Sequence, residues 1–363
     1  MKKRLLLIPL LAIAVLSLTR SEPPDNTIAA GLQPQISRDN IGVVRVVFGR
    51  ADSIFCSTSK DRGGTFSQPV FVGHVAGMHL GMTRGPQIAS SGHYTVVTAM
   101  DKAGNIHYFQ LTHDNNKWEY KGRVNDVPSS APEGLMSIAA DTKNHFYAVW
   151  LDVRQHNRNN ICFSSLSGTT GKWKKNTLIY ISPDEHVCEC CKPSIAVNGI
   201  KVAVMYRNWL NGSRDLYVMA SGDGGKTFKE AQKLGVGTWK LNGCPMDGGG
   251  VGIDDNGLIH TVWQREGSIY YCKPEESESN LIKGRLCSIA LDRANTKKRI
   301  ITLQDEGVVK MVDLDSKKEM TVGKGNFLKS IILGEEVLCV WEQDKNIRFR
   351  KVSIPAANTA FKK

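Results

Sequence analysis

The sequence predicts an all-β protein, a β-propeller of six or seven four-stranded blades. One phrase of short apolar strands recurs along the 363-residue chain, with starts about 40 to 60 residues apart, which is the length of a propeller blade. Helical periodicity is absent after the first twenty residues. A turn-forming octet also occurs twice, at 59–66 and 221–228, each time after a strand-like run.

Each copy of the repeated phrase has a short apolar strand, a second strand often ending in Trp or Tyr, a polar loop, a third strand and a turn. Seven phrases begin with "PQIS", "PQIAS", "LMSIAAD", "PSIAVNG", "GGVGIDDNG", "CSIALD" and "LKSIIL". The last two copies are the loosest, so six blades and seven blades both remain open. The final phrase lacks a fourth strand, which "NTIAAG" at 26–31 could supply to close the ring. We therefore expect one propeller domain over 32–356.

The N-terminus has the pattern of a secretory signal peptide, which we place at 1–20. The basic start "MKKR" precedes an apolar run at 5–18, which is short for a membrane span. Residues 21–31 form a leader that includes the closing strand, and 357–363 form a basic tail. This pattern predicts a secreted or periplasmic protein of the bacterial cell envelope, with no membrane span after cleavage.

The chain is basic, with 47 Lys and Arg against 35 Asp and Glu and a formal net charge of +12. A basic surface suits acidic glycans or envelope lipids. Secretion, together with the absence of any nucleic-acid motif, argues against a nucleic-acid partner. We expect a monomer that binds a glycan or another small acidic ligand and needs no cofactor.

The two octets, "SKDRGGTF" and "SGDGGKTF", can each be explained as a self-contained turn. The Asp accepts hydrogen bonds from backbone N–H groups ahead of it, and the Gly supplies a positive φ. The Ser and Thr bond across the neck of the turn, and the Phe returns the chain to the apolar core. The residues given this structural role are Ser59, Asp61, Gly63, Thr65 and Phe66, and Ser221, Asp223, Gly225, Thr227 and Phe228.

Propeller topology decides which loops share a face. Inner strands begin on one face, where the second-to-third strand loops also open, whereas third-to-fourth turns such as the octets lie on the opposite face. The first face collects several arginines and carboxylates, and Arg forks match carboxylates well. The candidate catalytic carboxylates are Glu133, Asp152 and Asp247. The candidate substrate-binding residues are Arg84, Arg154, Tyr206, Arg207 and Arg214.

Nine cysteines in a secreted chain predict disulfides and leave at least one thiol unpaired. Four stand within strand runs, where buried small hydrophobes are expected: Cys56, Cys162, Cys272 and Cys339. Four others precede neighbouring inner strands: Cys188, Cys190, Cys191 and Cys244. One interpretation is a disulfide from Cys190 or Cys191 to Cys244. The other is a metal site in which three thiolates and His186 bind Zn²⁺ or Cu(I).

The octets resemble the Asp-box of the sialidase-like β-propellers, the bacterial neuraminidase (BNR) repeat. A series of segments also resembles a group of bacterial secreted exo-α-sialidase-like proteins with a CECC motif: "RGP", "NDVPSSAPEGL", "WLDVR", "SPDEHVCECCKPS", "YRNWLNGSRDLY" and "LGVGTWKLNGCPMDGG". The resemblance covers roughly residues 36 to 270. It implies a sialidase-like fold and a glycoside hydrolase acting on acidic or other glycans at the axial mouth. Sialidases have six blades, whereas seven phrases are counted here.

In sialidases, three arginines hold the substrate carboxylate, a Tyr activated by Glu is the nucleophile, and an Asp is the acid–base group. By resemblance, Arg84, Arg207 and Arg214 would form the clamp. Glu133 or Asp152 would transfer the proton. The chain departs from the pattern where sialidases carry an early Arg-Ile-Pro, because it reads "QPQIS" there, and no Tyr–Glu pair can be assigned. Two functions stay open: a glycan-cleaving enzyme, and a non-catalytic propeller that binds a glycan, a protein or a metal.

Overall fold

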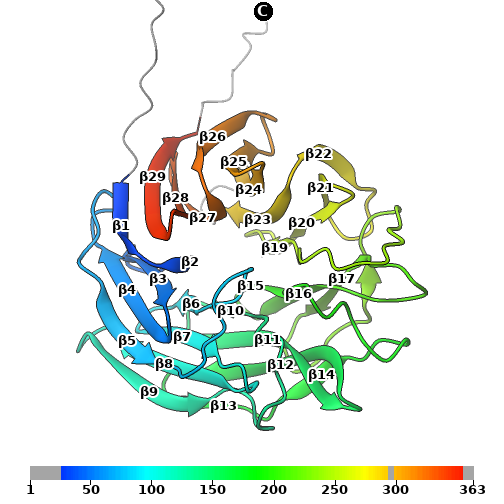
Figure 1. Cartoon of the computed structure of the whole chain (residues 1–363), viewed down its shortest axis with the longest axis horizontal. Coiled ribbons are helices and arrows are strands. Elements are labelled where there is room, and N and C mark those ends of the chain that lie inside the picture. Colours follow the sequence, from blue (N-terminus) through cyan, green and yellow to red (C-terminus); the bar gives the residue numbers. More distant parts are fainter. Residues whose placement is uncertain (1–25, 293–297, 355–363) are drawn as a thin grey trace, which may run out of the picture.

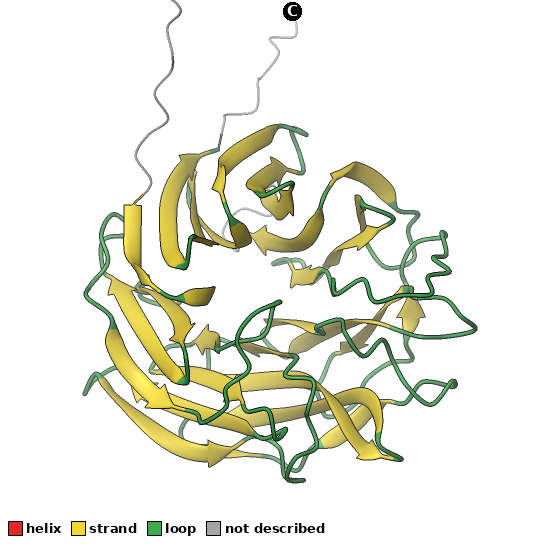
Figure 2. Cartoon of the chain, in the orientation of Figure 1, coloured by secondary structure: helices red, strands yellow, loops and turns green. Residues whose placement is uncertain are grey.

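The protein is a seven-bladed β-propeller, as the computed structural model shows. It describes residues 26–292 and 298–354, so the predicted signal peptide and basic tail lie outside the described residues. In these two ranges every regular element is a strand, and the strands form seven antiparallel sheets with no helix (Figure 2). Accordingly, no described segment is a helix that could cross a membrane. The prediction of an all-β propeller is confirmed, and the number of blades is seven.

The first three blades occupy the N-terminal half of the ring. Their strands are β2 (Leu32–Arg38), β3 (Val44–Arg50), β4 (Ser53–Ser59) and β5 (Val70–His74); β6 (Gln87–Ser90), β7 (Tyr94–Met100), β8 (Ile106–Thr112) and β9 (Lys117–Arg123); and β10 (Met136–Ala140), β11 (His145–Gln155), β12 (Arg158–Ser167), β13 (Lys172–Trp173) and β14 (Thr177–Tyr180). In the third blade both β13 and β14 pair with β12.

The next three blades continue the same order. Their strands are β15 (Ser194–Asn198), β16 (Lys201–Arg207), β17 (Leu216–Ser221) and β18 (Gln232–Lys233); β19 (Gly250–Ile253), β20 (Ile259–Arg265), β21 (Ser268–Cys272) and β22 (Ser279–Lys283); and β23 (Arg285–Leu291), β24 (Arg299–Asp305), β25 (Val308–Asp313) and β26 (Glu319–Lys324).

The seventh blade is built from both ends of the described chain. It contains β27 (Asn326–Leu333), β28 (Glu336–Gln343), β29 (Asn346–Ser353) and, on its outer edge, β1 (Asn26–Ala30). Strand β1 runs antiparallel to β29, from Asn26 opposite Phe349 to Ala30 opposite Asn346. Figure 1 shows this pairing as a blue strand beside a red one. The N-terminal strand therefore closes the ring by backbone hydrogen bonds.

Apolar side chains on both faces of the blades form the core between neighbours. Strand β3 has the sequence "VRVVFGR", and its first six residues are buried. Val46 and Phe48 from this strand pack with Leu338 and Val340 from the seventh blade. Strands buried on both faces favour β-branched and other apolar residues, which explains the near-continuous apolar runs of the sequence.

The seven inner strands, β2, β6, β10, β15, β19, β23 and β27, surround the central axis (Figure 1). Each of them begins on the same side of the ring, where the connections between blades also lie. We call this side the linker face and the opposite side the octet face. The octet at 59–66 joins β4 to β5 and the octet at 221–228 joins β17 to β18, so both lie on the octet face.

Each octet satisfies its own polar atoms. In the first, the Asp61 carboxylate accepts hydrogen bonds from the Thr65 backbone N–H at 3.0 Å and the Thr65 hydroxyl at 2.7 Å. In the second, Asp223 accepts the same pair from Thr227 at 3.0 and 2.6 Å. The Ser59 hydroxyl also accepts from the backbone N–H of Gly63 at 2.8 Å.

Each octet also contacts the preceding blade. Gly63 and Gly225 both have φ near 76°, a region that disfavours any residue with a Cβ. A Cβ at Gly225 would lie 2.4 Å from the ring of Phe163 in the preceding blade. Phe228 packs edge-on against that same ring, with centroids 5.1 Å apart. These turns therefore join two blades as well as two strands.

Candidate functional site

The guanidinium of Arg207 at the end of β16 is buried and bound to backbone oxygens. Its Nε and Nη2 donate to the carbonyl oxygen of Asp247 at 3.1 and 3.0 Å. Further bonds go to the carbonyl oxygens of Gln264 at 2.8 Å and Arg214 at 2.7 Å. With 1% of its surface exposed, Arg207 holds loops of two blades together and is not positioned to receive a substrate carboxylate.

Four other candidate residues of the linker face form two ion pairs, Arg84 with Glu133 and Arg154 with Asp152. Arg84 donates from Nε to the backbone oxygen of Glu133 at 2.5 Å, and its Nη2 lies 3.6 Å from the Glu133 carboxylate. Asp152 is fully buried and accepts from Arg154 Nε and from the indole of Trp150, both at 2.8 Å. The hydroxyl of Ser130 also donates to Asp152 at 2.8 Å, so this carboxylate ties β11 to the loop that precedes its blade and is closed off from solvent.

Tyr206 is also fully buried, and burial raises the pKa of its hydroxyl far above the usual range. Its ring packs beside that of Tyr180, 4.8 Å away. The resemblance placed Arg84, Arg207 and Arg214 in one clamp. Arg84 pairs with Glu133, whereas Arg207 donates to the Arg214 backbone oxygen and Arg214 lies against the Cys188 sulfur. The structure thus brings these residues to one face without aiming the three guanidinium groups at one open site.

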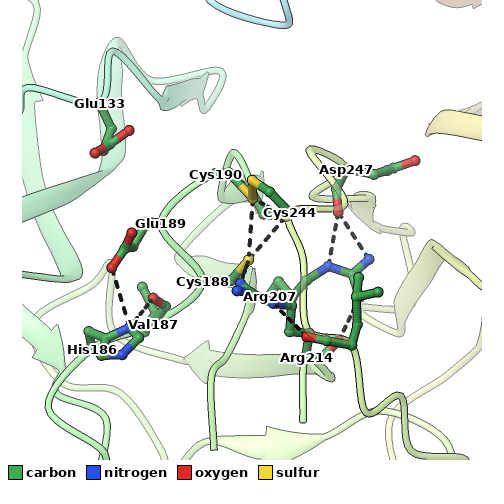
Figure 3. Close-up of a disulfide and its surroundings, with 12 residues drawn as sticks. Glu133, His186, Val187, Cys188, Glu189, Cys190, Arg207, Arg214, Cys244 and Asp247 are labelled. Carbon is green, nitrogen blue, oxygen red and sulfur yellow. Dashed lines mark hydrogen bonds and ion pairs between the residues drawn. A yellow bond between two sulfur atoms is a disulfide. The ribbon is translucent and has the colours of Figure 1, made fainter. Parts of the chain in front are cut away.

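The sulfur atoms at the starts of β15 and β19 do converge. Cys190 and Cys244 form a disulfide, as one of the two predicted pairings has it. The Sγ of Cys188 lies 3.7 Å from the Sγ of Cys190 (Figure 3). It also lies 3.4 Å from the Sγ of Cys191. The Sγ atoms of Cys190 and Cys191 are 3.9 Å apart. We call these four residues the sulfur cluster.

Arginine and thiol hydrogen bonds favour the thiolate of Cys188. A hydrogen bond from Cys191, followed by the charges of Arg214 and Arg207, lowers the pKa of Cys188 to about 6 despite its burial. Arg214 Nη1 lies 2.9 Å from the Cys188 sulfur, and its guanidinium stacks over the ring of Trp209 at 4.6 Å. Burial raises the pKa of Cys191 well above its usual value. The thiolate form is therefore favoured on Cys188 and disfavoured on Cys191.

His186 does not join the sulfur cluster. Its Nδ1 lies 3.0 Å from the backbone oxygen of Val187 and 3.8 Å from the Glu189 carboxylate (Figure 3). Its ring stacks on that of Trp209. Among the described residues, the group of potential metal ligands gathered here consists of Cys188, Cys190 and Cys191, together with the Cys244 partner of the disulfide. The predicted combination of three thiolates with an imidazole is therefore not assembled.

Next to the sulfur cluster, polar side chains fill the axis of the ring at the linker face. Lys192 donates to Gln87 at 2.7 Å, and Lys192, Lys329 and Asp247 line a small cavity of 40 Å³. Burial lowers the pKa of both lysines. The charge of Lys329 lowers the pKa of Lys192 further, whereas the charge of Asp247 acts in the opposite direction on Lys329. Burial likewise raises the pKa of Asp247, whose carboxylate accepts from the Leu286 backbone N–H at 2.6 Å. The axial mouth expected from the sequence is thus largely filled.

A larger pocket opens beside the axis, between the fifth and sixth blades. It has a volume of 390 Å³, and we call it the side pocket. Its lining includes Trp239, Cys244, Asp247, Arg285, Asp305 and Glu306. Arg285 is exposed, and in the part of the chain that the structure describes its guanidinium has no hydrogen bond or ion pair, although its charge acts on Asp247. The side pocket therefore offers an aromatic ring, a free cation and several carboxylates in one place.

A cavity of 1030 Å³ opens on the octet face instead. Aliphatic side chains of the inner strands form its walls, as at Ile88 and Ile138. The acidic groups at its rim bind their own turns: Asp39 accepts from the backbone N–H of Val43 at 2.9 Å, and Asp141 from that of His145 at 2.9 Å. Arg38 and Arg62 also line this axial chamber and donate to the backbone oxygens of Ile332 and Leu333. We place the candidate site on the linker face because the side pocket combines an aromatic ring, an exposed arginine and carboxylates.

Sequence reasoning missed several residues of this site. Lys192 directly follows the cysteine run, and Lys329 lies within the inner strand β27, so both lie in segments that the topology placed near the axis. Asp305 and Glu306 form a second-to-third loop of the sixth blade, whose phrase was one of the loosest. Trp239 lies in the long segment before β19, where no repeat pattern places it. The four cysteines expected in strand runs are buried, as predicted.

Comparison with known proteins identifies the class by fold. No family model matches the chain, and no curated protein sequence matches it. An α-L-arabinanase from Penicillium chrysogenum complexed with arabinobiose matches with a TM-score of 0.56 at 12% identity, over 91% of this chain and 98% of that chain. An ulvan lyase, a polysaccharide lyase bound to -[GlcA(1-4)Rha3S]-, matches with a TM-score of 0.54 at 11% identity, over 91% and 94% of the two chains.

A third similar structure is YCF48 bound to D1 peptide, with a TM-score of 0.53 at 11% identity, over 92% of this chain and 96% of that chain. One fold thus carries a sugar-bound arabinanase, a polysaccharide lyase and a peptide-bound protein. Identities this low show the shared fold alone. The chain is a seven-bladed β-propeller, and its function must be argued from its own site.

Proposed function

We propose that this protein binds an acidic glycan in the side pocket and cleaves it, as a hydrolase or a lyase. The observation that carries the proposal is the unpaired Arg285 guanidinium in the same 390 Å³ pocket as Trp239. Sugar rings stack on aromatic side chains, and a guanidinium fork matches a carboxylate or sulfate. The Arg207 guanidinium lies 5.4 Å from the Trp239 ring centre and supports the indole from inside the protein.

Several independent features favour an acidic glycan over other ligands. The net charge of +12 attracts anions to the surface. The fold is shared with a lyase whose structure contains a glucuronate-bearing disaccharide, and with an arabinanase. The resemblance of the octets and the cysteine-rich loop to sialidase-like proteins supports the same substrate class and a secreted location.

Asp247 is the candidate proton donor. Its carboxyl is buried, lines the side pocket and has a raised pKa because of that burial. A raised pKa favours the protonated acid, which is the form that can donate a proton to a glycosidic oxygen. Asp305 and Glu306 line the same pocket and supply carboxylates for the complementary role of base or nucleophile. Sialidase chemistry through Tyr206 is not favoured, because Tyr206 is buried and, unlike Asp247, does not line the side pocket.

The binding step is tested by calorimetry with oligosaccharides that contain a uronic acid, compared with neutral oligosaccharides of the same length. Arg285→Ala should weaken binding of the acidic sugar about tenfold or more, since a charge-assisted hydrogen bond contributes about 1.5–3 kcal/mol. The control is Arg158→Ala, which removes another exposed arginine of the linker face outside the pocket. Equal affinity in Arg285→Ala and the wild-type protein would contradict the proposal.

The cleavage step is tested separately, with product analysis on the same sugars. Asp247→Asn should retain binding and reduce turnover by about 10²-fold or more. Its melting temperature must be followed, because Asp247 also accepts backbone hydrogen bonds from Leu286 and Gly249. Binding that depends on Arg285 without any cleavage in the wild-type protein would establish the second candidate, a non-catalytic glycan-binding propeller.

A further inference from the structure

The sulfur cluster brings four sulfur atoms together, whereas a disulfide requires only two. Three sulfur atoms, from Cys188, Cys190 and Cys191, form a triangle with sides of 3.4, 3.7 and 3.9 Å. The fourth sulfur, from Cys244, is covalently bound to Cys190 and so lies at the same place. A single disulfide requires two of these sulfurs. Four cysteines from two loops have nevertheless been brought to one point.

The triangle has the spacing of thiolates around a metal ion. Thiolates in a tetrahedral zinc site lie about 2.3 Å from the ion, which separates neighbouring sulfurs by about 3.8 Å. The three observed separations surround that value. The spacing already exists without any rearrangement of the loop before β15, and Cys244 supplies a fourth corner when its bond to Cys190 is broken.

The surroundings of the cluster suit a site rich in negative charge. Arg214 Nη1 lies 2.9 Å from the Cys188 sulfur and donates a hydrogen bond to it. The backbone N–H of Cys188 donates to the Arg207 carbonyl oxygen at 3.0 Å, so the loop is fixed to β16. Such groups around a metal site orient the ligands and offset the charge of the thiolates. They also give Arg207 and Arg214 a structural role here.

We propose that Cys188, Cys190, Cys191 and Cys244 form a four-thiolate site for a thiophilic d¹⁰ metal ion, Zn²⁺ or Cu(I), in the reduced protein. Soft thiolate ligands select these ions over Mg²⁺ and Ca²⁺. The Cys190–Cys244 disulfide is then the metal-free, oxidised alternative of the same site. Cys244 is exposed and lines the side pocket, which gives the ion a path from solvent.

Conversion between the two states needs a two-electron reductant, which is a dithiol or, in the experiment, a phosphine. Reduction breaks the bond between Cys190 Sγ and Cys244 Sγ, places one additional electron on each sulfur and oxidises the reductant. The ion then binds the four sulfurs, and the remaining thiol protons pass to solvent. No redox change of Zn²⁺ is involved.

The proposal is tested on the full chain after reduction with a phosphine, removal of metal and transfer to anaerobic buffer. Zn²⁺ and Cu(I) are titrated in separate samples against chromophoric chelators, and Co²⁺ is added as a probe for its thiolate-to-metal absorption. We expect one ion per chain in at least one of the two titrations, together with a thiolate-to-cobalt band. The unreduced protein should bind at least tenfold less metal.

A second measurement requires no variant. Alkylation of the reduced wild-type protein, mapped by mass spectrometry, should modify Cys244 quickly without metal and at least tenfold more slowly with one equivalent of the bound ion. Variants extend this result: Cys191→Ser and Cys244→Ser should each weaken binding, whereas Cys56→Ala, which removes a core thiol of the first blade, should not.

Two results would overturn the proposal. The first is a fully reduced, folded protein that retains neither Zn²⁺ nor Cu(I) at one equivalent. The second is undiminished metal binding by the Cys191→Ser and Cys244→Ser variants, which would place the ion elsewhere.

Discussion

The octet at 221–228 and the cysteine loop at 188–191 are both short loops outside the strands, yet they are stabilised in opposite ways. The octet finds nearly all its polar partners within eight residues, from the Ser221 hydroxyl to the Thr227 backbone. The cysteine loop depends on distant partners: Cys190 bonds a residue 54 positions away, and Cys188 bonds Arg214, 26 positions away. A turn whose polar partners are all local can recur in different blades of the chain. The cysteine loop needs residues from other loops, so it forms at one place in the fold.

Among the variants that test this contrast, we expect the largest loss of stability at Arg207, which stabilises the loops around the cysteines. Arg207→Ala should lower the free energy of unfolding by about 3 kcal/mol or more, because buried carbonyl oxygens on three residues lose their donor. Urea unfolding followed by tryptophan fluorescence measures the change. Arg285→Ala is the matched control, because it removes an exposed arginine whose guanidinium has no hydrogen bond or ion pair among residues 26–292 and 298–354. A loss below about 1 kcal/mol would show that the loops are held by other contacts.

A smaller effect is expected in the octet. Gly225→Ala places a Cβ at a positive φ and 2.4 Å from the ring of Phe163, so it should cost about 2 kcal/mol or more. Gly222→Ala is the control, since a Cβ at Gly222 has no atom of other residues within 4 Å. Both variants are compared by thermal unfolding. Equal melting temperatures would mean that the octet does not depend on contact with the preceding blade.

The smallest effect concerns acid stability. Hydrogen bonds from Thr65 hold the pKa of Asp61 well below its usual range, and those from Thr227 do the same for Asp223. A native pKa below the unfolded value of about 3.9 stabilises the fold above that pH, and the contribution is lost as the pH falls through the lowered native pKa. Asp223→Asn should therefore lower the melting temperature at pH 6 and have less effect at pH 2.5.

The matched control for acid stability is Asp114→Asn, which changes an exposed aspartate in the corresponding third-to-fourth turn of the second blade. It should leave the melting temperature unchanged at both pH values. A pH-independent deficit in Asp223→Asn would contradict the assignment of this stabilisation to the carboxylate.

The same contrast explains what the sequence could predict. Strand periodicity and turn chemistry are local, so they predicted the propeller and the arrangement of the octets. Because the repeated phrases of the sixth and seventh blades are loose, the sequence left open whether the propeller has six or seven blades. Topology also predicted which residues reach the linker face. It could not predict that Arg207 points inward to the Asp247 carbonyl oxygen, or that His186 turns towards Trp209, because side-chain directions depend on neighbours far away in sequence.

The side pocket was missed for the same reason. Trp239 and Arg285 come from segments around two different blades, and neither belongs to a pattern that repeats along the chain. Cys244 and Asp247 were singled out, but as parts of an axial mouth that Lys192 and Lys329 in fact occupy. A pocket between blades becomes visible only when the ring is closed.

The most direct test of the account is a crystal structure of the protein with an oligosaccharide that contains a uronic acid, soaked at a concentration that saturates binding in solution. We predict sugar density in the side pocket, with a ring against Trp239 and its carboxylate at Arg285. Density in the axial chamber of the octet face, or an unliganded side pocket under those conditions, would contradict the central claim that the linker face carries the function.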